Sequence, residues 1–159
     1  MTSGIVETFN GMPVHYIDEQ DALEAAAAGW LRREVVALDT EFMRVRTFHA
    51  QAALFQVCDG EACFLVDPLA VGDLAPLARL LDARDVLKVM HSCSEDLEVC
   101  DRHLGALPDP LVDTQIVAAF CGYPLSVGYQ KMLVTEFDVH LGKSETRTDW
   151  LQRPLSAAQ

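Results

Sequence analysis

Two carboxylates, Asp39 and Glu41, stand one residue apart at the end of an apolar run, residues 35–38. This run predicts a buried β-strand, because β-branched and aliphatic residues suit a strand covered on both faces. Side chains alternate along a strand, so both acids are expected on one face. Buried like charges need a positive partner, and a divalent cation with oxygen ligands is the simplest one. The spacing alone leaves a second interpretation open, in which one acid caps a turn and the other faces water.

A third acid, Asp96, follows another short apolar run, residues 86–90. Ser92 or Ser94 is expected to cap a helix whose first turn contains Glu95 and Asp96, where the helix dipole favours negative charge. In mixed α/β sheets, ligands bind beyond the carboxyl ends of the strands. All three acids are therefore expected to meet at one edge of the sheet.

Two other polar residues near these acids are interpreted as structural. His91 follows a strand and resembles a candidate general base, but we expect it to hold the fold together. Asp113 is better placed to cap the next helix than to bind metal.

The composition predicts one domain of a cytoplasmic protein. The chain has 159 residues, of which 50% are hydrophobic, enough for a single core. It contains no apolar run of membrane-spanning length and no signal-peptide pattern. Its five cysteines form no zinc-binding or disulfide pattern, which favours reduced structural thiols.

The charge argues against non-specific binding of nucleic acid. The net charge is −12, whereas such binders normally have a basic surface. Cations do gather near the end of the chain, at Lys131, Lys143, Arg147 and Arg153. Binding of a polyanion would therefore depend on metal ions and a few local cations.

The hydrophobic pattern predicts an α/β fold with a mixed sheet and helices on both faces. Strands are expected over 14–17, 35–42, 52–58, 62–66, 86–90 and 111–112. Helices are expected over 22–31, 73–81, from about 94 onward, 115–120 and 127–137. The three strands between 35 and 66 should form an antiparallel meander, with a tight turn at Asp59-Gly60.

The two ends of the chain are expected to differ from this regular pattern. Residues 1–12 are expected to be a flexible leader, because they are rich in Thr, Ser and Gly and have no periodicity. A polar loop around Trp150 is expected within 142–154. Residues 155–159 resemble the opening of another helix, with Ser156 as its cap.

Several of these segments resemble the DEDD 3′-5′ exonucleases. Residues 39–42 (DTEF) are similar to the first motif, and residues 91–96 (HSCSED) to the second in its ribonuclease D form. The resemblance continues through 113–115 and through 143–155 (KSETRTDWLQRPL), and covers about residues 14–159. It implies a ribonuclease H-like fold, with 13–159 as an exonuclease domain.

The resemblance also implies a chemistry. Family members use two divalent ions, Mg²⁺ or Mn²⁺, to remove nucleotides one at a time from RNA 3′ ends, as in tRNA maturation. Asp39 resembles the ligand that bridges both ions, Glu41 the ligand that also contacts the 3′-hydroxyl, and Asp96 a ligand of the second ion. Two ions about 4 Å apart stabilise both the attacking and the leaving oxygen. Phe42 and Lys143 match positions near the terminal nucleotide, although a core aromatic and a surface lysine are equally good interpretations.

One family motif is missing. A helix with Tyr-x-x-x-Asp should supply a water-orienting phenol and a fourth acid on one face. None of Tyr16, Tyr123 or Tyr129 has an aspartate four residues later. We therefore expect a catalytic domain that is incomplete at its C-terminus, holds one ion or none, and has little or no activity.

Two further expectations follow from this departure. The apolar surface that the missing helix would cover could lead to self-association. The alternative function is a degenerate nuclease-fold module that binds RNA ends or a protein partner without catalysis. A flavodoxin-like nucleotide binder is disfavoured, since there is no glycine-rich phosphate loop.

Overall fold

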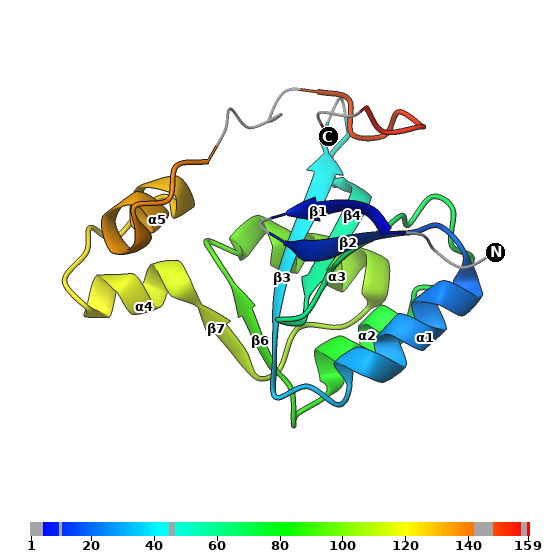
Figure 1. Cartoon of the computed structure of the whole chain (residues 1–159), viewed down its shortest axis with the longest axis horizontal. Helices are drawn as coiled ribbons and strands as arrows, with labels where there is room; N and C mark the ends of the chain where they lie inside the picture. The colour runs from blue at the N-terminus through cyan, green and yellow to red at the C-terminus, as the bar shows by residue number, and fades with distance from the viewer. Residues whose placement is uncertain (1–4, 10, 45–46, 142–147, 157–158) are drawn as a thin grey trace.

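The computed structural model describes residues 5–9, 11–44, 47–141, 148–156 and 159. Within these ranges a seven-stranded sheet and five helices form one α/β unit (Figure 1). The strands are β1 (Ile5–Phe9), β2 (Met12–Ile17), β3 (Val35–Met43), β4 (Gln51–Cys58), β5 (Cys63–Val66), β6 (Leu87–Met90) and β7 (Leu111–Asp113). The helices are α1 (Gln20–Trp30), α2 (Ala75–Asp82), α3 (Ser94–Leu104), α4 (Thr114–Phe120) and α5 (Tyr129–Phe137).

The sheet is mixed, in the order β1-β2-β5-β4-β3-β6-β7. The predicted meander is confirmed, because β4 pairs antiparallel with both β3 and β5. Strand β6 runs parallel to β3, and β7 parallel to β6. The carboxyl ends of β3, β6 and β7 therefore lie at one edge of the sheet, where the predicted acids belong.

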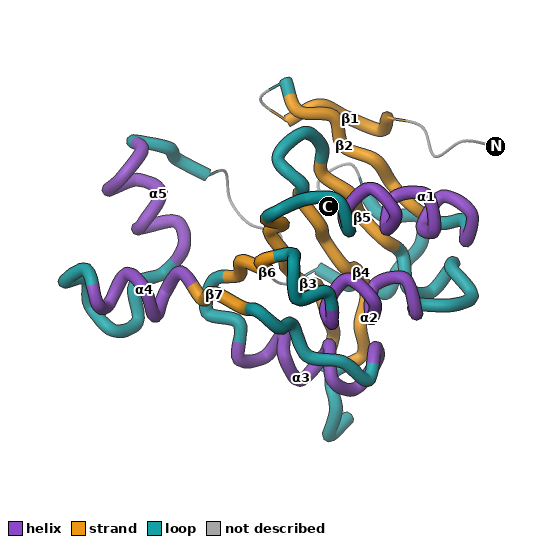
Figure 2. Tube along the Cα trace, turned by 90° about the horizontal axis from the view of Figure 1, so that it is seen from below, coloured by secondary structure: helices purple, strands orange, loops and turns teal. Residues whose placement is uncertain are grey.

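One face of the sheet is covered by α1, α2 and α3, as Figure 2 shows. The main core lies between these layers and includes Trp30, Leu23, Val36, Leu80 and Val99, all nearly inaccessible to water. Each such side chain contributes on the order of 1.5–3 kcal/mol by leaving water. None of the helices in the described ranges is long and apolar enough to cross a membrane.

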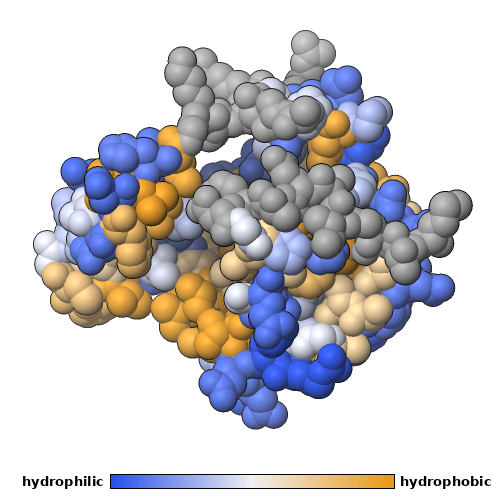
Figure 3. Space-filling view, in the orientation of Figure 1, coloured by the Kyte–Doolittle hydropathy of each residue, from blue (hydrophilic) through white to orange (hydrophobic). Residues whose placement is uncertain are grey.

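The opposite face of the sheet is covered only in part. Residues 148–155 lie over one end, where Trp150 packs against Ala53 and Leu54. The rest of this face lines a groove of about 590 Å³ between the sheet and α5. Figure 3 shows this hollow beside the α4–α5 lobe, whose visible surface has both polar and apolar parts.

The N-terminal segment corrects one prediction. Residues 5–9, expected to be part of a flexible leader, form strand β1 and pair antiparallel with β2. The sequence Ile-Val-Glu-Thr-Phe has high strand propensity, and pairing with β2 gives its backbone groups partners. The turn between the strands places Gly11 at a φ of 82°, which glycine adopts without strain.

The predicted cap of α3 is also corrected. The N-cap of α3 is Cys93, and neither Ser92 nor Ser94 caps the helix. Asp113 fixes the start of α3 instead, because its carboxylate accepts hydrogen bonds from the backbone N–H groups of Ser92 and Cys93. The Ser156 hydroxyl accepts the backbone N–H of Gln159 at 3.3 Å, the contact expected of a cap, and residues 157–158 lie outside the described residues.

The segment around Trp150 is held in place by a buried ion pair. The Arg153 guanidinium donates from Nε and Nη2 to the two Asp67 carboxylate oxygens at 2.5 and 2.8 Å. The Tyr16 hydroxyl donates to the same carboxylate, and Arg153 also donates to the Ala53 carbonyl. Burial alone would raise the pKa of Asp67, but Arg153 and Tyr16 outweigh it and hold the pKa below its usual range.

Replacing Asp67 should therefore destabilise the protein in a pH-dependent way. We expect Asp67→Asn to lower the free energy of unfolding at pH 7 by about 3 kcal/mol, as for a broken buried ion pair. A depressed carboxyl pKa stabilises the native state above the unfolded pKa of about 3.9, and this stabilisation disappears as pH falls. The difference from wild type should thus shrink below about pH 4 in urea-unfolding curves.

The matched control is Glu24→Gln, which breaks the exposed pair with Arg79 and should cost less than about 0.5 kcal/mol. Equal effects of the two substitutions at pH 7 would contradict the importance of the buried pair.

Candidate metal centre

Asp39 and Glu41 lie at the carboxyl-terminal half of β3, in the middle of the sheet. Asp39 pairs with Gln56 and Glu41 with Leu54 on β4, in a regular register. The register shifts only after Glu41, so strand alternation places both acids on the groove side of the sheet. The predicted common face is therefore observed.

Asp96 reaches the same edge from α3, on the other side of β3. Its carboxylate Oδ1 accepts the Thr40 hydroxyl at 2.5 Å, and the residue is only 8% exposed. Thr40 lies between Asp39 and Glu41 and so points to the opposite face, toward α3. This hydrogen bond ties the second acidic motif to the first.

The three carboxyls perturb one another electrostatically. Burial, and then the charge of Asp96, raise the pKa of Asp39 to about 6. Burial and the charges of Asp39 and Asp96 raise the pKa of Glu41 to about 7. Burial also raises the pKa of Asp96, against the stabilising hydrogen bond from Thr40. Three acids that resist ionisation together are a setting in which a bound cation is strongly favoured.

The three acids lie near one another but, among the residues that the structure describes, are not arranged as a complete set of ligands for one metal ion. In the described ranges, no three His, Cys, Asp or Glu side chains are arranged to share one metal ion. Mutual repulsion, together with the engagement of Asp96 by Thr40, accounts for this open arrangement. The donor chemistry fits a hard divalent cation, since all three groups are carboxylates. Their role as metal ligands stays a prediction.

Sequence reasoning missed one residue, Thr40, and one further contact of Asp113 that position this site. Thr40 orients Asp96, and strand alternation alone could have indicated that it faces the helix. Asp113 was expected to cap α4, and its acceptance of the Gln115 N–H confirms this. The same carboxylate also fixes the turn before α3, a contact between separate segments that no local pattern reveals.

The remaining candidates differ in their surroundings. Phe42 is partly buried and packs against the main core, which agrees with the interpretation as a core aromatic. Lys143 lies outside the described residues. His91 is hydrogen-bonded to the Thr114 hydroxyl and the Val127 carbonyl, which confirms its structural role.

Comparison with known proteins identifies the family. A family model described as 3'-5' exonuclease matches residues 14–159. The chain belongs to this exonuclease family. The exonuclease-family domain is 49% identical to ribonuclease D of Pseudomonas paraeruginosa over 146 residues, and 46% identical to that of Escherichia coli over 148. It spans 39% and 40% of the length of these relatives, respectively.

Solved structures give the same fold. The E. coli RNase D crystal structure, described as an exoribonuclease involved in structured RNA processing, superposes with a TM-score of 0.88 at 46% identity. This match covers 92% of the exonuclease-family domain and 39% of the E. coli chain. The Nibbler EXO domain of Aedes aegypti has a TM-score of 0.82 at 18% identity, which shows the fold alone. The predicted ribonuclease H-like mixed sheet is thus confirmed.

The raised pKa values of Asp39 and Glu41 predict a pH dependence of stability. A native-state pKa above the unfolded value means that the folded exonuclease-family domain binds protons more tightly, so its stability falls as pH rises from about 4 to about 7. With EDTA present, Asp39→Asn should be more stable than wild type at pH 8 by about 1 kcal/mol, after allowance for screening by water. At pH 4 the variant and the wild type should have the same free energy of unfolding.

Urea unfolding at the two pH values measures this difference. Asp101→Asn, an exposed acid on the same helix as Asp96, should leave the pH profile unchanged. Lower stability of Asp39→Asn at pH 8 would contradict the repulsion.

Proposed function

We propose that this chain is the exonuclease module of a ribonuclease D-type 3′-5′ exoribonuclease. The observation that carries the proposal is the meeting of Asp39, Glu41 and Asp96 at one sheet edge, with the pKa of each raised. Mg²⁺ or Mn²⁺ would supply the missing positive charge, and Asp39, Glu41 and Asp96 would hold it. The similarity to ribonuclease D over most of this chain supports the same function.

The carboxylates that hold the ions would come from both faces of β3. The bound ions would supply Lewis-acid stabilisation of the phosphodiester oxygens and lower the pKa of the attacking water. Asp39 and Glu41 would present oxygen ligands from the groove side. Asp96 would reach the same ions from α3, held by the Thr40 hydroxyl. The raised pKa values keep these carboxyls partly protonated until a cation binds.

The proposed substrate is the 3′ end of an RNA, with tRNA precursors as natural candidates in the cytoplasm. The chain's net charge of −12 disfavours non-specific attraction of RNA, so metal and local cations would provide most of the attraction. Phe42 follows Glu41 directly and would pack against the terminal nucleotide. Lys143 would approach the same nucleotide as a point charge.

Self-association is a further part of the proposal. Large apolar side chains stand exposed on the α4–α5 lobe, including Phe120 at 89% and Leu125 at 84% exposure. Contiguous exposed apolar surface of this kind favours contact between molecules. Light scattering over a range of concentrations measures it directly.

A second candidate function is RNA-end binding without catalysis. The open arrangement of the acids favours it, since no ion-holding group of three forms within the described residues. In this case the nuclease fold would recognise a 3′ end, and the phosphodiester bond would stay intact. An assay that separates binding from cleavage distinguishes the two candidates.

Cleavage should depend on the three carboxylates. With 5′-labelled RNA and Mn²⁺, we expect little or no shortening by this chain, and products shortened one nucleotide at a time by a longer chain that includes a Tyr-x-x-x-Asp helix. In that longer chain Asp39→Asn should reduce the rate at least about 100-fold, because one ligand of the ions is lost. The ladder on a denaturing gel measures this. Asp101→Asn serves as the matched control and should leave the ladder intact.

A ladder that persists in Asp39→Asn would refute the metal role. RNA retention in a filter-binding assay with no shortening of the label would support the second candidate.

Phe42 should affect substrate binding more than chemistry. Phe42→Leu keeps an apolar side chain against the core but removes the ring that would stack on a base, a contact worth about 1–3 kcal/mol. We therefore expect KM to rise roughly tenfold with kcat nearly unchanged. Phe120→Leu, on exposed α4, is the control. If Phe42→Leu changes only the thermal stability and leaves KM unchanged, Phe42 serves only as a core residue.

A further inference from the structure

Three sulfur atoms meet on the groove side of the sheet. Met12 begins β2, Cys58 ends β4 and Cys63 begins β5. Cys58 and Cys63 are direct cross-strand partners, and Cys63 also pairs with Val14, two residues after Met12. Because side chains two residues apart share a face, all three sulfurs project to the same side.

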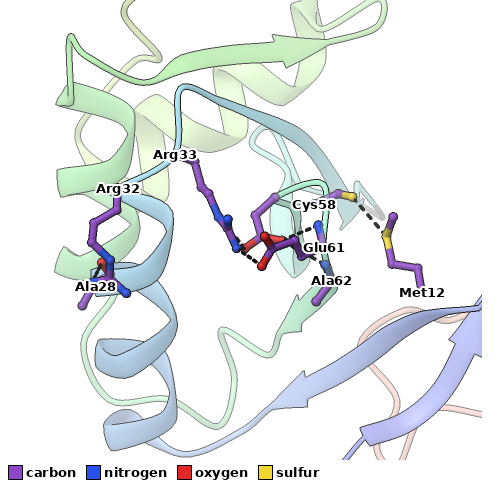
Figure 4. A network of polar contacts seen from close by, with 8 residues as sticks. Met12, Ala28, Arg32, Arg33, Cys58, Glu61 and Ala62 are labelled. Atoms are coloured by element: carbon purple, nitrogen blue, oxygen red, sulfur yellow. Dashed lines mark hydrogen bonds and ion pairs between the residues drawn. The ribbon is translucent and has the colours of Figure 1, made fainter.

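The sulfur atoms are in mutual contact. The Cys58 thiol donates to the Met12 thioether at 3.6 Å, a contact drawn in Figure 4, and the Cys63 thiol donates to it at 3.5 Å. The two thiols lie side by side as cross-strand partners. Both cysteines line the groove between the sheet and α5, so the cluster can be reached from solvent.

We propose that Met12, Cys58 and Cys63 form a binding site for Cu(I). Thiolate and thioether ligands select this soft ion over hard cations. With metal–sulfur bonds of about 2.3 Å, as for zinc, the sulfurs of a trigonal site lie about 4 Å apart. The observed contacts of 3.5 and 3.6 Å need only a small expansion to reach this spacing.

Met12 distinguishes this site from a simple pair of cysteines. A disulfide between Cys58 and Cys63 would need only the two thiols, whereas here a third sulfur lies within contact distance of both. A thioether has no proton to lose and takes part in hydrogen bonding only as a weak acceptor. Its position between two thiols is what a three-coordinate soft ion requires.

The electrostatic surroundings of the three sulfur atoms favour binding of a cation. Burial, the adjacent Cys58 and the charge of Asp59 raise the pKa of Cys63 to about 11, so the Cys63 thiol is neutral in the empty cluster. On binding, each thiol gives its proton to solvent as its sulfur–copper bond forms, and copper stays in the +1 state. Asp59, which directly follows Cys58, is held in place by an ion pair with Arg33.

This sulfur site is separate from the carboxylate site. Cys58 pairs with Ala37 and Gln56 with Asp39, so the two sites are two residues apart along β4, roughly 7 Å. Mg²⁺ and Mn²⁺ prefer oxygen ligands and should leave the sulfurs free. The inference therefore does not rest on the proposed nuclease function.

The test is an anaerobic titration of the reduced full chain with Cu(I) in competition with bathocuproine disulfonate. We expect one Cu(I) per chain and a thiolate-to-copper charge-transfer absorption. Cys58→Ser and Cys63→Ser should each weaken binding at least about 100-fold, and Met12→Leu about tenfold, because a ligand is lost with little change in volume. Cys121→Ser, an exposed thiol elsewhere, should bind as wild type.

A second measurement works without substitutions. Bound Cu(I) should protect Cys58 and Cys63, and not Cys121, from alkylation by iodoacetamide, as read by peptide mass spectrometry. Asp39→Asn should bind Cu(I) like wild type, and excess Mg²⁺ should not displace it.

Three outcomes would overturn the proposal. One is stoichiometric binding that survives Cys58→Ser or Cys63→Ser, and another is loss of binding in Cys121→Ser. The third is a Cys58–Cys63 disulfide, seen as a loss of two hydrogens in mass, in a chain that binds no Cu(I) after reduction.

Discussion

The repulsion among Asp39, Glu41 and Asp96 is the constraint on which this structure depends. Burial raises the pKa of all three groups, and the charges of neighbouring acids raise those of Asp39 and Glu41 further, so the folded chain keeps them together at an energetic cost. The cost is sustained because β3 is central in the sheet and α3 packs directly against it. A positive ligand at this edge would relieve the repulsion among these acids.

Elements on both faces of the sheet hold the residues at this edge in position. On the core side, Asp113 fixes the turn before α3, and Thr40 fixes Asp96. On the groove side, Arg153 anchors the segment whose Trp150 packs against Leu54, the cross-strand partner of Glu41. The carboxylates of Asp39 and Glu41 and the sulfur cluster thus lie on one sheet face but differ in chemical hardness.

Regular elements could be predicted well, because their signals are local. The apolar run before Asp39 and the Asp59-Gly60 turn specify β3 and the hairpin that follows, and the structure agrees with the predicted meander. Strand β1 was missed because Thr, Ser and Gly around it suggested a leader, while its pairing with β2 depends on an edge formed elsewhere. The cap of α3 was missed because Asp113, 20 residues away from Cys93, replaces the local serines.

The sequence by itself determined the acid spacing on β3, the order of strands and helices, and the family to which the chain belongs. Only the tertiary structure decided that Thr40 joins the two acidic motifs, that Asp67 and Arg153 anchor the final segment, and that three sulfurs meet across three strands. The physical reason is that hydrogen bonds, ion pairs and sulfur contacts between distant segments depend on strand register and packing. The spacing of residues along the chain encodes neither the strand register nor the packing of distant segments.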